Sequence, residues 1–510
     1  MSYNIAVGTG SSFPSLDSFL YSFVKWSVQV DKSFLPYDTN KNCFFAQCQD
    51  SKCEFRIRVS LNRPSDCFLV REFHDHSEYC DSPSTSQLPS NYLAYIVMDN
   101  VVSDSFVSPE KLKTSLAEKG FNVSYNKTLR SLSSARQLTY GNCDSSFSKL
   151  MDLKAELQLQ NDEAIFSVET QLNGTFKRLF FALQQSIVGH EFCLPIIGLN
   201  GTHIKTKMGG VVLIATSLDP NGQCYPLCFD VVSVENEINW TEFLTDMNTF
   251  FQIKPGTTII SDRHKGLINA VDTVFGDSVY HCYCLNHISD NLLKKGGKKA
   301  VDLFWKVATS NNVQEFQMLM NRMQSECNRA RMLLSDLPTK HWADLFIEGE
   351  RYGHYTNNIS ESINAWINDA RKLPITQMIT NIINQLSDWF KERRHYGEKM
   401  IGEFVDKVEE EIKRHQIIGR QFAMEEIDPD RMYKIEQFHI SYNVDLENEQ
   451  CSCFEWQKRK IPCIHAISVL RRKNASIRRK ISRVYEASYY RKCYMKQVNK
   501  LRNPIYWQTV

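Results

Sequence analysis

The sequence predicts a multidomain α/β protein of the α+β type, in which a mixed sheet is flanked by small β-rich modules that carry Cys and His. Three observations support this fold class. The chain has 510 residues, whereas a single domain takes about 150. Apolar runs closed by turn residues recur between residues 193 and 262, with helical patterns between and after them. Paired Cys and His residues lie in short segments near both ends.

The composition is that of a folded protein, with 42% hydrophobic and 23% charged residues. No stretch approaches the roughly 18 uninterrupted apolar residues of a membrane helix, so we expect no membrane contact. The first residues lack a basic segment followed by an apolar one, which predicts an intracellular protein. In a reducing compartment the 16 cysteines are buried thiols or metal ligands rather than disulfides.

The N-terminal third predicts a small sheet followed by helices. Residues 1–40 give only a weak pattern, and residues 41–73 alternate as strands in CFFAQC, CEFRIRVSL and CFLVREF. The polar segment 81–91 predicts a linker. Short helices follow, one of which, PEKLKTSLAEKG, should stop at Gly120. We therefore place one domain at 1–85 and a helical, DNA-binding-like region at 86–165.

The middle of the chain predicts the mixed sheet. Apolar runs in this region predict strands. The segment INWTEFL predicts an amphipathic helix that begins near Trp240 and packs Phe243 and Leu244 against the sheet. The pattern is then mainly helical, returns to strand, and closes with a short helix. The expected strands are 193–201, 210–219, 225–234, 255–262 and 432–450, and the helical segments are 285–425 and 463–473. The predicted domains are 166–425, with a helical insertion at about 296–345, then 426–475 and a basic tail at 476–510.

A zinc site is predicted near the C-terminus. The segment CSCFEWQKRKIPCIH holds a Cys-x-Cys pair and a Cys-x-His pair, formed by Cys451, Cys453, Cys463 and His465. Four such ligands suit tetrahedral zinc without an open position. The first pair lies at a strand end, and the second enters a helix just after Pro462. Buried cysteines with a core histidine are the alternative interpretation.

The segment resembles a SWIM-type zinc finger. Val444-Asp445-Leu446, Trp456 and Ile461-Pro462 also match that pattern. The resemblance implies a DNA- or protein-binding element rather than a catalyst.

A second zinc site is predicted in the N-terminal sheet. Cys48 and Cys53 are separated by four residues on a hairpin-like stretch, and His74 and His76 follow a strand some twenty residues later. The arrangement resembles the zinc-bound sheet of WRKY-like and Mutator N-terminal domains, which could present a strand to a DNA groove. Either histidine could be unliganded, and a metal-free β-domain is the alternative. Other available ligands are Cys43, Cys67 and Cys80.

Positive charge is concentrated at the C-terminus, although the whole chain carries only +2. Residues 471–510 contain twelve Lys or Arg against one acid, Glu486. Such a segment predicts contact with a polyanion, since each neutralised phosphate releases counterions; a solvated basic helix or tail is the alternative. The candidate DNA-binding residues are Arg471, Arg472, Lys473, Arg478, Arg479 and Lys480.

Many short motifs in order resemble the Mutator-like element (MULE/MuDR) transposase family across most of residues 90–505. The matching segments are RLFFALQQSIVG, CLPIIGLNGTHIKTKMGG, ATSLDPNGQCYPL, ENEINWTEFL, ISDRHKGLINAV, HCYCLNHISDNL and NNISESINAWINDARKLPI. The resemblance implies an RNase H-like mixed sheet with a helical insertion, flanked by small zinc-binding modules. It also implies three acids that hold two Mg²⁺ or Mn²⁺ ions for phosphoryl transfer.

The matching motifs assign the second and third of these acids to residues of this chain. Asp262 in ISD matches the second acid, and Glu361 in ISES matches the third, on a helix that should face the sheet. Cys284 and His287 match an accessory Cys-x-x-His between them. Without the resemblance, a core thiol and a hydrogen-bonded histidine would be the preferred interpretation of that pair.

The first acid is missing, because Asn200 stands where the family pattern has Asp. An amide offers an oxygen to a metal but no charge to offset the repulsion between two ions. Asp219 follows the next strand in a turn and suits a structural role. His203 or Glu235 could partly compensate. We therefore expect impaired strand transfer.

Three functions follow from these features. The preferred one is a nuclear, transposase-derived protein that binds zinc and double-stranded DNA, at element terminal repeats or regulatory sites, as a homo-oligomer. The second is an active DNA transposase, which the retention of Asp262, Glu361, Cys284 and His287 favours. The third is a zinc-dependent interaction factor or transcription regulator. The salt dependence of duplex binding separates the third from the first two.

Overall fold

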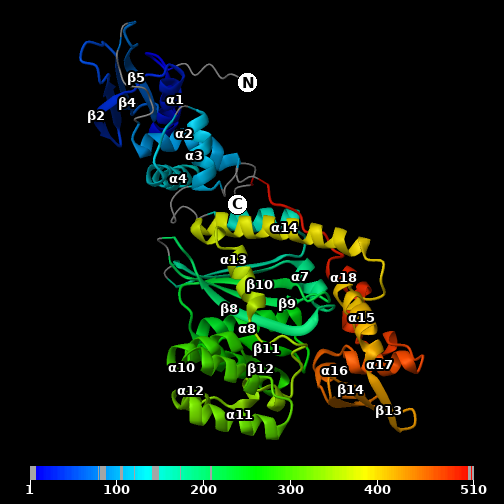
Figure 1. The fold of residues 1–510 in the computed structure, drawn as a ribbon. Helices are drawn as coiled ribbons and strands as arrows, with labels where there is room; N and C mark the ends of the chain where they lie inside the picture. Colours follow the sequence, from blue (N-terminus) through cyan, green and yellow to red (C-terminus); the bar gives the residue numbers. More distant parts are fainter. Residues whose placement is uncertain are drawn as a thin grey trace. The chain divides into compact units, whose positions relative to one another are not determined.

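In the computed structural model the chain contains two compact units, residues 1–146 and residues 147–510 (Figure 1). The residues it describes are 7–78, 80, 88–103, 107–119, 121–140, 147, 149–172, 174–206, 209–502 and 507. None of the helices in these ranges is long and apolar enough to cross a membrane.

The first helix of unit 1 is not revealed by the weak pattern of residues 1–40. Helix α1 spans Leu16–Gln29, and the Ser15 hydroxyl caps it by accepting a hydrogen bond from the Ser18 N–H. Phe19, Phe23 and Val24 are buried on one face. Its many aromatic and β-branched residues favour strands by propensity, so only packing against the sheet selects the helix.

The unit 1 sheet is antiparallel, with the strand order β1-β5-β4-β3-β2. Its strands are β1 (Ser12–Phe13), β2 (Leu35–Asn40), β3 (Cys43–Gln47), β4 (Arg56–Asn62) and β5 (Cys67–His74). The expected strands in residues 41–73 correspond to β3, β4 and β5.

The described residues of unit 1 continue with the helices α2 (Ser90–Ser103), α3 (Pro109–Glu118) and α4 (Tyr125–Tyr140). Their buried faces belong to the same hydrophobic core as the sheet and α1. The expected boundary near residue 85 therefore lies inside unit 1, with core residues on both sides. Helix α3 has its C-cap at Lys119, while Gly120 and most of the expected linker 81–91 lie outside the described residues.

Unit 2 is built on a seven-stranded mixed sheet of order β12-β11-β8-β9-β10-β7-β6. Strands β8, β11 and β12 run parallel, and the remaining neighbours pair antiparallel. The strands are β6 (Ile165–Thr170), β7 (Phe176–Ala182), β8 (Leu194–His203), β9 (Val211–Leu218), β10 (Cys224–Val232), β11 (Thr258–Ser261) and β12 (Tyr280–Tyr283). The mixed sheet is confirmed, although β6, β7 and β12 were not among the expected strands.

Helices pack against this sheet. Helix α8 (Glu237–Phe251) buries Trp240, Phe243 and Leu244, as expected for an amphipathic helix. Helix α13 (Asn358–Trp366) packs against β8, β9 and β10, which it crosses in Figure 1. Helix α7 (Gln184–His190) also packs against β10. Other helices of this part of the chain are α6 (Leu150–Gln160), α9 (Lys265–Phe275) and α14 (Ile375–Lys399).

A helical subdomain follows β12. It contains α10 (Leu285–Ala308), α11 (Val313–Glu326) and α12 (Asn328–Ser335). Helix α10 is interrupted at Gly297, whose φ of 69° is in the left-handed region that glycine tolerates. These helices share a core of their own that includes Leu292, Phe304 and Trp342.

The C-terminal part of unit 2 adds a small four-stranded sheet of order β13-β14-β15-β16. Strand β13 falls at the end of the segment expected to be helical, because pairing with β14 outweighs its local helix propensity. The elements are α15 (Asp406–Ile418), β13 (Ala423–Asp428), β14 (Met432–Gln437), β15 (Ile440–Asp445), β16 (Gln450–Cys451), α16 (Glu455–Arg459) and α17 (Ile464–Arg472).

The segment expected as a basic tail is folded onto unit 2 over most of its length. Helix α18 (Ala487–Cys493) lies within it. Tyr494 is fully buried and donates a hydrogen bond to Asp219 Oδ2 at 2.8 Å. Arg502 forms an ion pair with Glu156 at 2.7 Å. Tyrosines between the basic residues thus anchor this segment to the core.

Candidate functional site

The C-terminal candidate ligands converge at the junction of β16 and α17. The donor atoms of Cys451, Cys453, Cys463 and His465 lie within 4.8 Å of one another. His465 turns Nδ1 toward the thiols, 3.6 Å from Cys451 Sγ and 3.8 Å from Cys463 Sγ. Its other nitrogen, Nε2, lies 2.8 Å from Gln437 Oε1, and this hydrogen bond fixes the tautomer and the ring orientation. Cys451, Cys463 and His465 are buried and Cys453 is half-buried, and four protein ligands leave no open position, which fits structural zinc.

The electrostatics of this cluster favour a shared negative charge. Hydrogen bonds from Cys451 and Cys463 lower the pKa of the Cys453 thiol well below its ordinary value. The same Cys453 interaction raises the pKa of Cys451 to about 12. A divalent cation would remove this conflict by binding all the sulfurs as thiolates.

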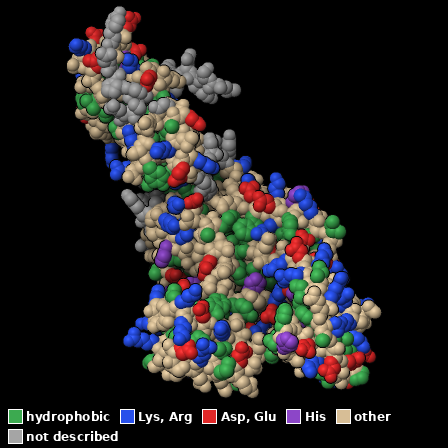
Figure 2. Space-filling view, viewed as in Figure 1, with side chains coloured by type: hydrophobic (Ala, Val, Ile, Leu, Met, Phe, Trp, Pro, Cys, Tyr) green, Lys and Arg blue, Asp and Glu red, His purple; other side chains and the backbone are tan. Residues whose placement is uncertain are grey.

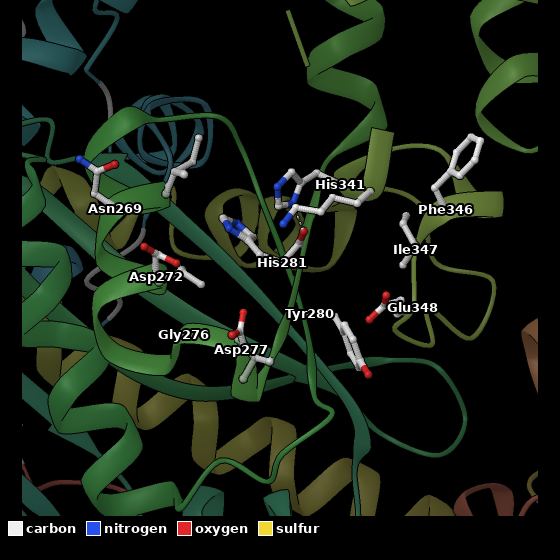
Figure 3. Close-up of a pocket in the computed structure, with 14 residues that line it drawn as sticks. Asn269, Asp272, Gly276, Asp277, Tyr280, His281, His341, Phe346, Ile347 and Glu348 are labelled. Carbon is white, nitrogen blue, oxygen red and sulfur yellow. Dashed lines mark hydrogen bonds between the residues drawn. The ribbon is translucent and has the colours of Figure 1, made fainter. Parts of the chain in front are cut away.

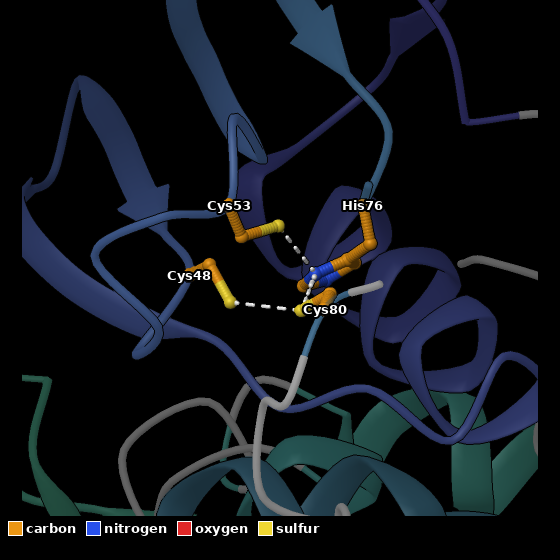
Figure 4. Close-up of side chains that lie close together, drawn as sticks. All are labelled: Cys48, Cys53, His76 and Cys80. Atoms are coloured by element: carbon orange, nitrogen blue, oxygen red, sulfur yellow. Dashed lines mark hydrogen bonds between the residues drawn. The ribbon is translucent and has the colours of Figure 1, made fainter. Parts of the chain in front are cut away.

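Four side chains of unit 1 also point toward one centre: Cys48, Cys53, His76 and Cys80 (Figure 4). Cys48 Sγ lies 3.4 Å from Cys80 Sγ. His76 Nδ1 lies 3.4 Å from the sulfurs of both Cys53 and Cys80. Burial lowers the pKa of His76 to about 4, so its ring is the neutral form that binds metals. The donor set fits zinc.

This arrangement differs from the expected ligand set at one position. His74 is the last residue of β5, and its side chain is 48% exposed, with Nε2 3.2 Å from Glu72 Oε1. The strand holds it on the outer side, beside Arg56 on β4. His76 lies beyond the end of the strand, where the chain turns inward and stacks the ring on Phe55 at 4.0 Å. The cluster therefore contains Cys80 in place of His74.

The candidate nuclease residues meet at one edge of the large sheet. Leu199 on β8 pairs with Ser261 on the parallel strand β11, so Asn200 and Asp262 are the next residues along two adjacent strands. Gly198 and Asn200 share a face because side chains alternate along a strand. A Cβ at Gly198 would meet Ser360 and Asn357, which places this face under α13, the helix that carries Glu361.

The Cys-x-x-His pair joins the same edge at the start of α10. Cys284 is the N-cap of α10, and its N–H donates to Ser261 O at 2.8 Å. The donor atoms of Cys284, His287 and Glu361 lie within 4.8 Å of one another. The pKa of His287 is raised to about 9, first by a hydrogen bond with Cys284 and then by the charges of Cys284, Asp262 and Glu361. Four residues that the sequence predicts for this site therefore interact here, namely Asp262, Cys284, His287 and Glu361.

Residues that could replace the first acid do not lie on this face. A Cβ at Gly201 would be 2.7 Å from Glu235 Oε2, so Glu235 lies against the opposite face of β8. His203 shares that opposite face by alternation and is exposed. Asp219 is fully buried and bound by Arg393 at 3.1 Å, and burial raises its pKa to about 6. The first position therefore has only the Asn200 amide.

Most of the candidate DNA-binding cations are already paired within the protein. Lys473 lies 2.8 Å from Asp430, Arg478 lies 2.8 Å from Glu409, and Lys480 lies 3.0 Å from Glu449. Arg472 donates to the Phe422 carbonyl. Among the described residues, Arg471 and Arg479 have no ion-pair partner. On the face that Figure 2 presents, Lys and Arg are likewise interspersed with Asp and Glu.

A pocket of about 430 Å³ lies beside β12 and was not indicated by any sequence motif (Figure 3). His281 and His341 line it, and His341 Nδ1 donates to the His281 carbonyl at 2.6 Å. His281 Nε2 lies 2.8 Å from Ser261 Oγ, next to Asp262. Both histidines therefore already bond within the protein, and His281 contacts Ser261, the residue before Asp262.

Three family models match separate parts of the chain. A MULE transposase domain matches residues 196–291, which cover β8 to the start of α10. A SWIM zinc finger matches residues 442–474, which include the C-terminal cluster. A MuDR family transposase model matches residues 4–70 of unit 1. A search of curated proteins gives no match. The chain is a MuDR/MULE transposase-family protein with a SWIM zinc finger.

Proposed function

We propose that this protein binds double-stranded DNA and zinc and that metal-dependent strand transfer is absent or strongly impaired. The observation that carries the proposal is Asn200. It lies on β8 one residue after the Leu199–Ser261 pair, and Asp262 directly follows Ser261, the last residue of β11. Its side chain is on the face covered by α13, the helix that carries Glu361.

The physical reason is electrostatic. Two divalent ions about 4 Å apart repel each other by about 17 kcal/mol at an effective dielectric constant near 20. Carboxylates between the ions offset that repulsion, and here the first position carries no charge. Glu235 and His203 face away from it, so neither supplies the missing carboxylate. The residues present do not fit a pair of Mg²⁺ ions.

DNA binding rests on other parts of the chain. The MuDR family match to residues 4–70 covers the sheet of unit 1 and two of its four clustered ligands, Cys48 and Cys53. A zinc-stapled sheet of this kind can present a strand to a groove of duplex DNA. Such binding implies a nuclear location, and we expect the protein to act there as a homo-oligomer.

A cleavage assay tests the nuclease part of the proposal. The substrate is duplex DNA that carries the element's terminal repeats, with Mg²⁺ or Mn²⁺. We expect no cleavage by the natural chain and metal-dependent cleavage by Asn200→Asp. The gain should disappear in the double variant Asn200→Asp/Asp262→Ala. Robust cleavage by the natural chain, lost in Asp262→Ala, would refute the proposal.

An active transposase is the second candidate, and one observation favours it. Asp262, Glu361, Cys284 and His287 interact at a single sheet edge although they are distant in sequence. The cleavage assay decides between the two candidates. Duplex binding that weakens steeply with added salt supports either one, because displaced counterions accompany phosphate contacts. Failure to bind duplex DNA would instead favour a zinc-dependent interaction factor.

A further inference from the structure

The sheet edge contains a third group of metal-ligand side chains, separate from the two Cys-rich clusters. Cys284 comes from the N-cap of α10, His287 from its first turn, and Glu361 from α13. Their donor atoms lie within 4.8 Å of one another. Small side-chain movements would bring all three to the spacing that a single ion requires.

The donor chemistry of this group selects against magnesium. A thiolate and an imidazole are soft or borderline ligands that suit Zn²⁺, whereas Mg²⁺ takes oxygen. Ionised Cys284 and Glu361 carry a charge of −2, which balances one divalent ion. Three protein ligands with a fourth position left open are typical of reactive zinc sites rather than structural ones.

Contacts around Cys284 and His287 favour metal binding by these two residues. Cys284 is fully buried at the positive end of α10, and the N–H of Asn357 donates to its sulfur at 3.2 Å. Both features direct hydrogen-bond donors toward the sulfur and fix its position at the sheet edge. Among the described side chains, His287 Nδ1 is a buried nitrogen without a hydrogen-bond partner. A metal ion would supply the partner that this atom lacks.

We propose that this edge of the sheet binds one Zn²⁺ ion through Cys284, His287 and Glu361, in place of a pair of Mg²⁺ ions. The neutral Asn200 is compatible with this occupancy, because a single ion needs no third carboxylate to offset ion–ion repulsion. The inference goes beyond the proposed function: it concerns which metal the edge holds, and duplex binding does not depend on it.

Metal analysis of the full chain tests the proposal. Three groups of ligands occur among the described residues, so we expect about three zinc ions per chain. Cys284→Ser should lose one of them. Cys327→Ser, which changes a buried cysteine outside all three groups, is the matched control and should lose none. The readout is the difference between variants and does not depend on the occupancy of the other clusters.

Two further variants guard against misfolding at position 284. His287→Ala and Glu361→Gln change partly exposed residues and should each weaken retention of the same ion, with an unchanged circular dichroism spectrum. Millimolar Mg²⁺ should not displace it. Equal zinc content in the natural chain and in all three folded variants would overturn the proposal. Duplex binding and cleavage, measured on the same preparations, report separately on the proposed function.

Discussion

Asn357 connects the segments that form the sheet edge. It is fully buried, its Nδ2 donates to Leu199 O at 2.7 Å, and its backbone N–H donates to Cys284 Sγ. Gly198 makes this approach possible, because a Cβ there would lie 2.6 Å from Asn357 Oδ1. One residue, through its side chain and its backbone N–H, therefore ties β8 and the start of α10 to the start of α13.

Replacing Asn357 should loosen this edge. We expect Asn357→Ala to lower the free energy of unfolding by about 1–3 kcal/mol, because the Leu199 carbonyl is left buried without this donor. Thermal or urea denaturation measures the change. Asn358→Ala is the control, since Asn358 is exposed and its side chain accepts from the Asn286 amide at the surface. Similar losses in the two variants would contradict the assigned role.

At the scale of elements, both Cys-rich clusters lie where a strand leaves its sheet. In unit 1 the end of β5 separates the exposed His74 from the inward-facing His76. In unit 2 the cluster joins β16 to α17, and its thiols belong to the small core that contains Tyr433, Val444 and Trp456. A metal ion at each position would tie the end of a strand to the segment beside it.

The ligand assignment in unit 1 can be tested by exchange of single residues. We expect Cys80→Ser to lose one zinc ion per chain and His74→Ala to lose none, because His74 contacts Glu72 rather than the cluster. Metal analysis of the purified variants measures this. Zinc loss in His74→Ala with retention in Cys80→Ser would restore the ligand set expected from the sequence.

Removing zinc should unfold the C-terminal module selectively. With a strong chelator present, amide hydrogens in residues 423–474 should exchange much faster, because the small core contains two of the ligands, Cys451 and Cys463. Amides of β8, β9 and β10 should stay protected, since the large sheet has its own core. Unchanged exchange in residues 423–474 would show that this module folds without metal.

At the scale of the whole molecule, the basic C-terminal segment is mostly part of unit 2. Tyr485, Tyr490 and Tyr494 are buried, and three of its six candidate DNA-binding cations are paired with acids from other elements. The number of Lys and Arg residues in the sequence therefore overstates the number of unpaired cations that this surface offers to a nucleic acid.

Two consequences can be measured separately, and the first concerns stability. Tyr494→Ala should lower the free energy of unfolding by about 3–5 kcal/mol, because it empties a fully buried aromatic position and removes a hydrogen bond to Asp219. The exposed Arg491 on the same segment provides the control, as Arg491→Ala should change stability by less than about 0.5 kcal/mol. A comparable effect of both changes would mean that the segment is a loosely held tail.

The second consequence concerns DNA. If this surface contacts phosphates, Arg471→Ala and Arg479→Ala should each weaken duplex binding and reduce the salt slope by about one. Lys473→Ala should do less, because its ammonium is paired with Asp430 and Glu426. Fluorescence anisotropy at several salt concentrations measures the slopes. No change in either arginine variant would place the DNA contact elsewhere on the protein.

Sequence patterns accounted for the strands β8 to β11 and for the C-terminal ligand pairs, because both depend on near neighbours. An apolar run bounded by turn residues is visible within ten residues, as is Cys-x-His at a helix start. Strand β12 and helix α1 were missed. The first is a four-residue strand, and the second has a composition typical of strands.

The sequence by itself determined the fold class, the transposase family and the loss of charge at position 200, since these follow from residue identity and order. Only the tertiary structure decided that Cys80 joins His76, that Glu235 lies on the wrong face of β8, and that α10 and α13 bring Cys284 next to Glu361. The physical reason is that these contacts join residues far apart along the chain. Which side of a strand a residue faces, and what packs over it, is fixed by burial across the whole unit rather than by local pattern.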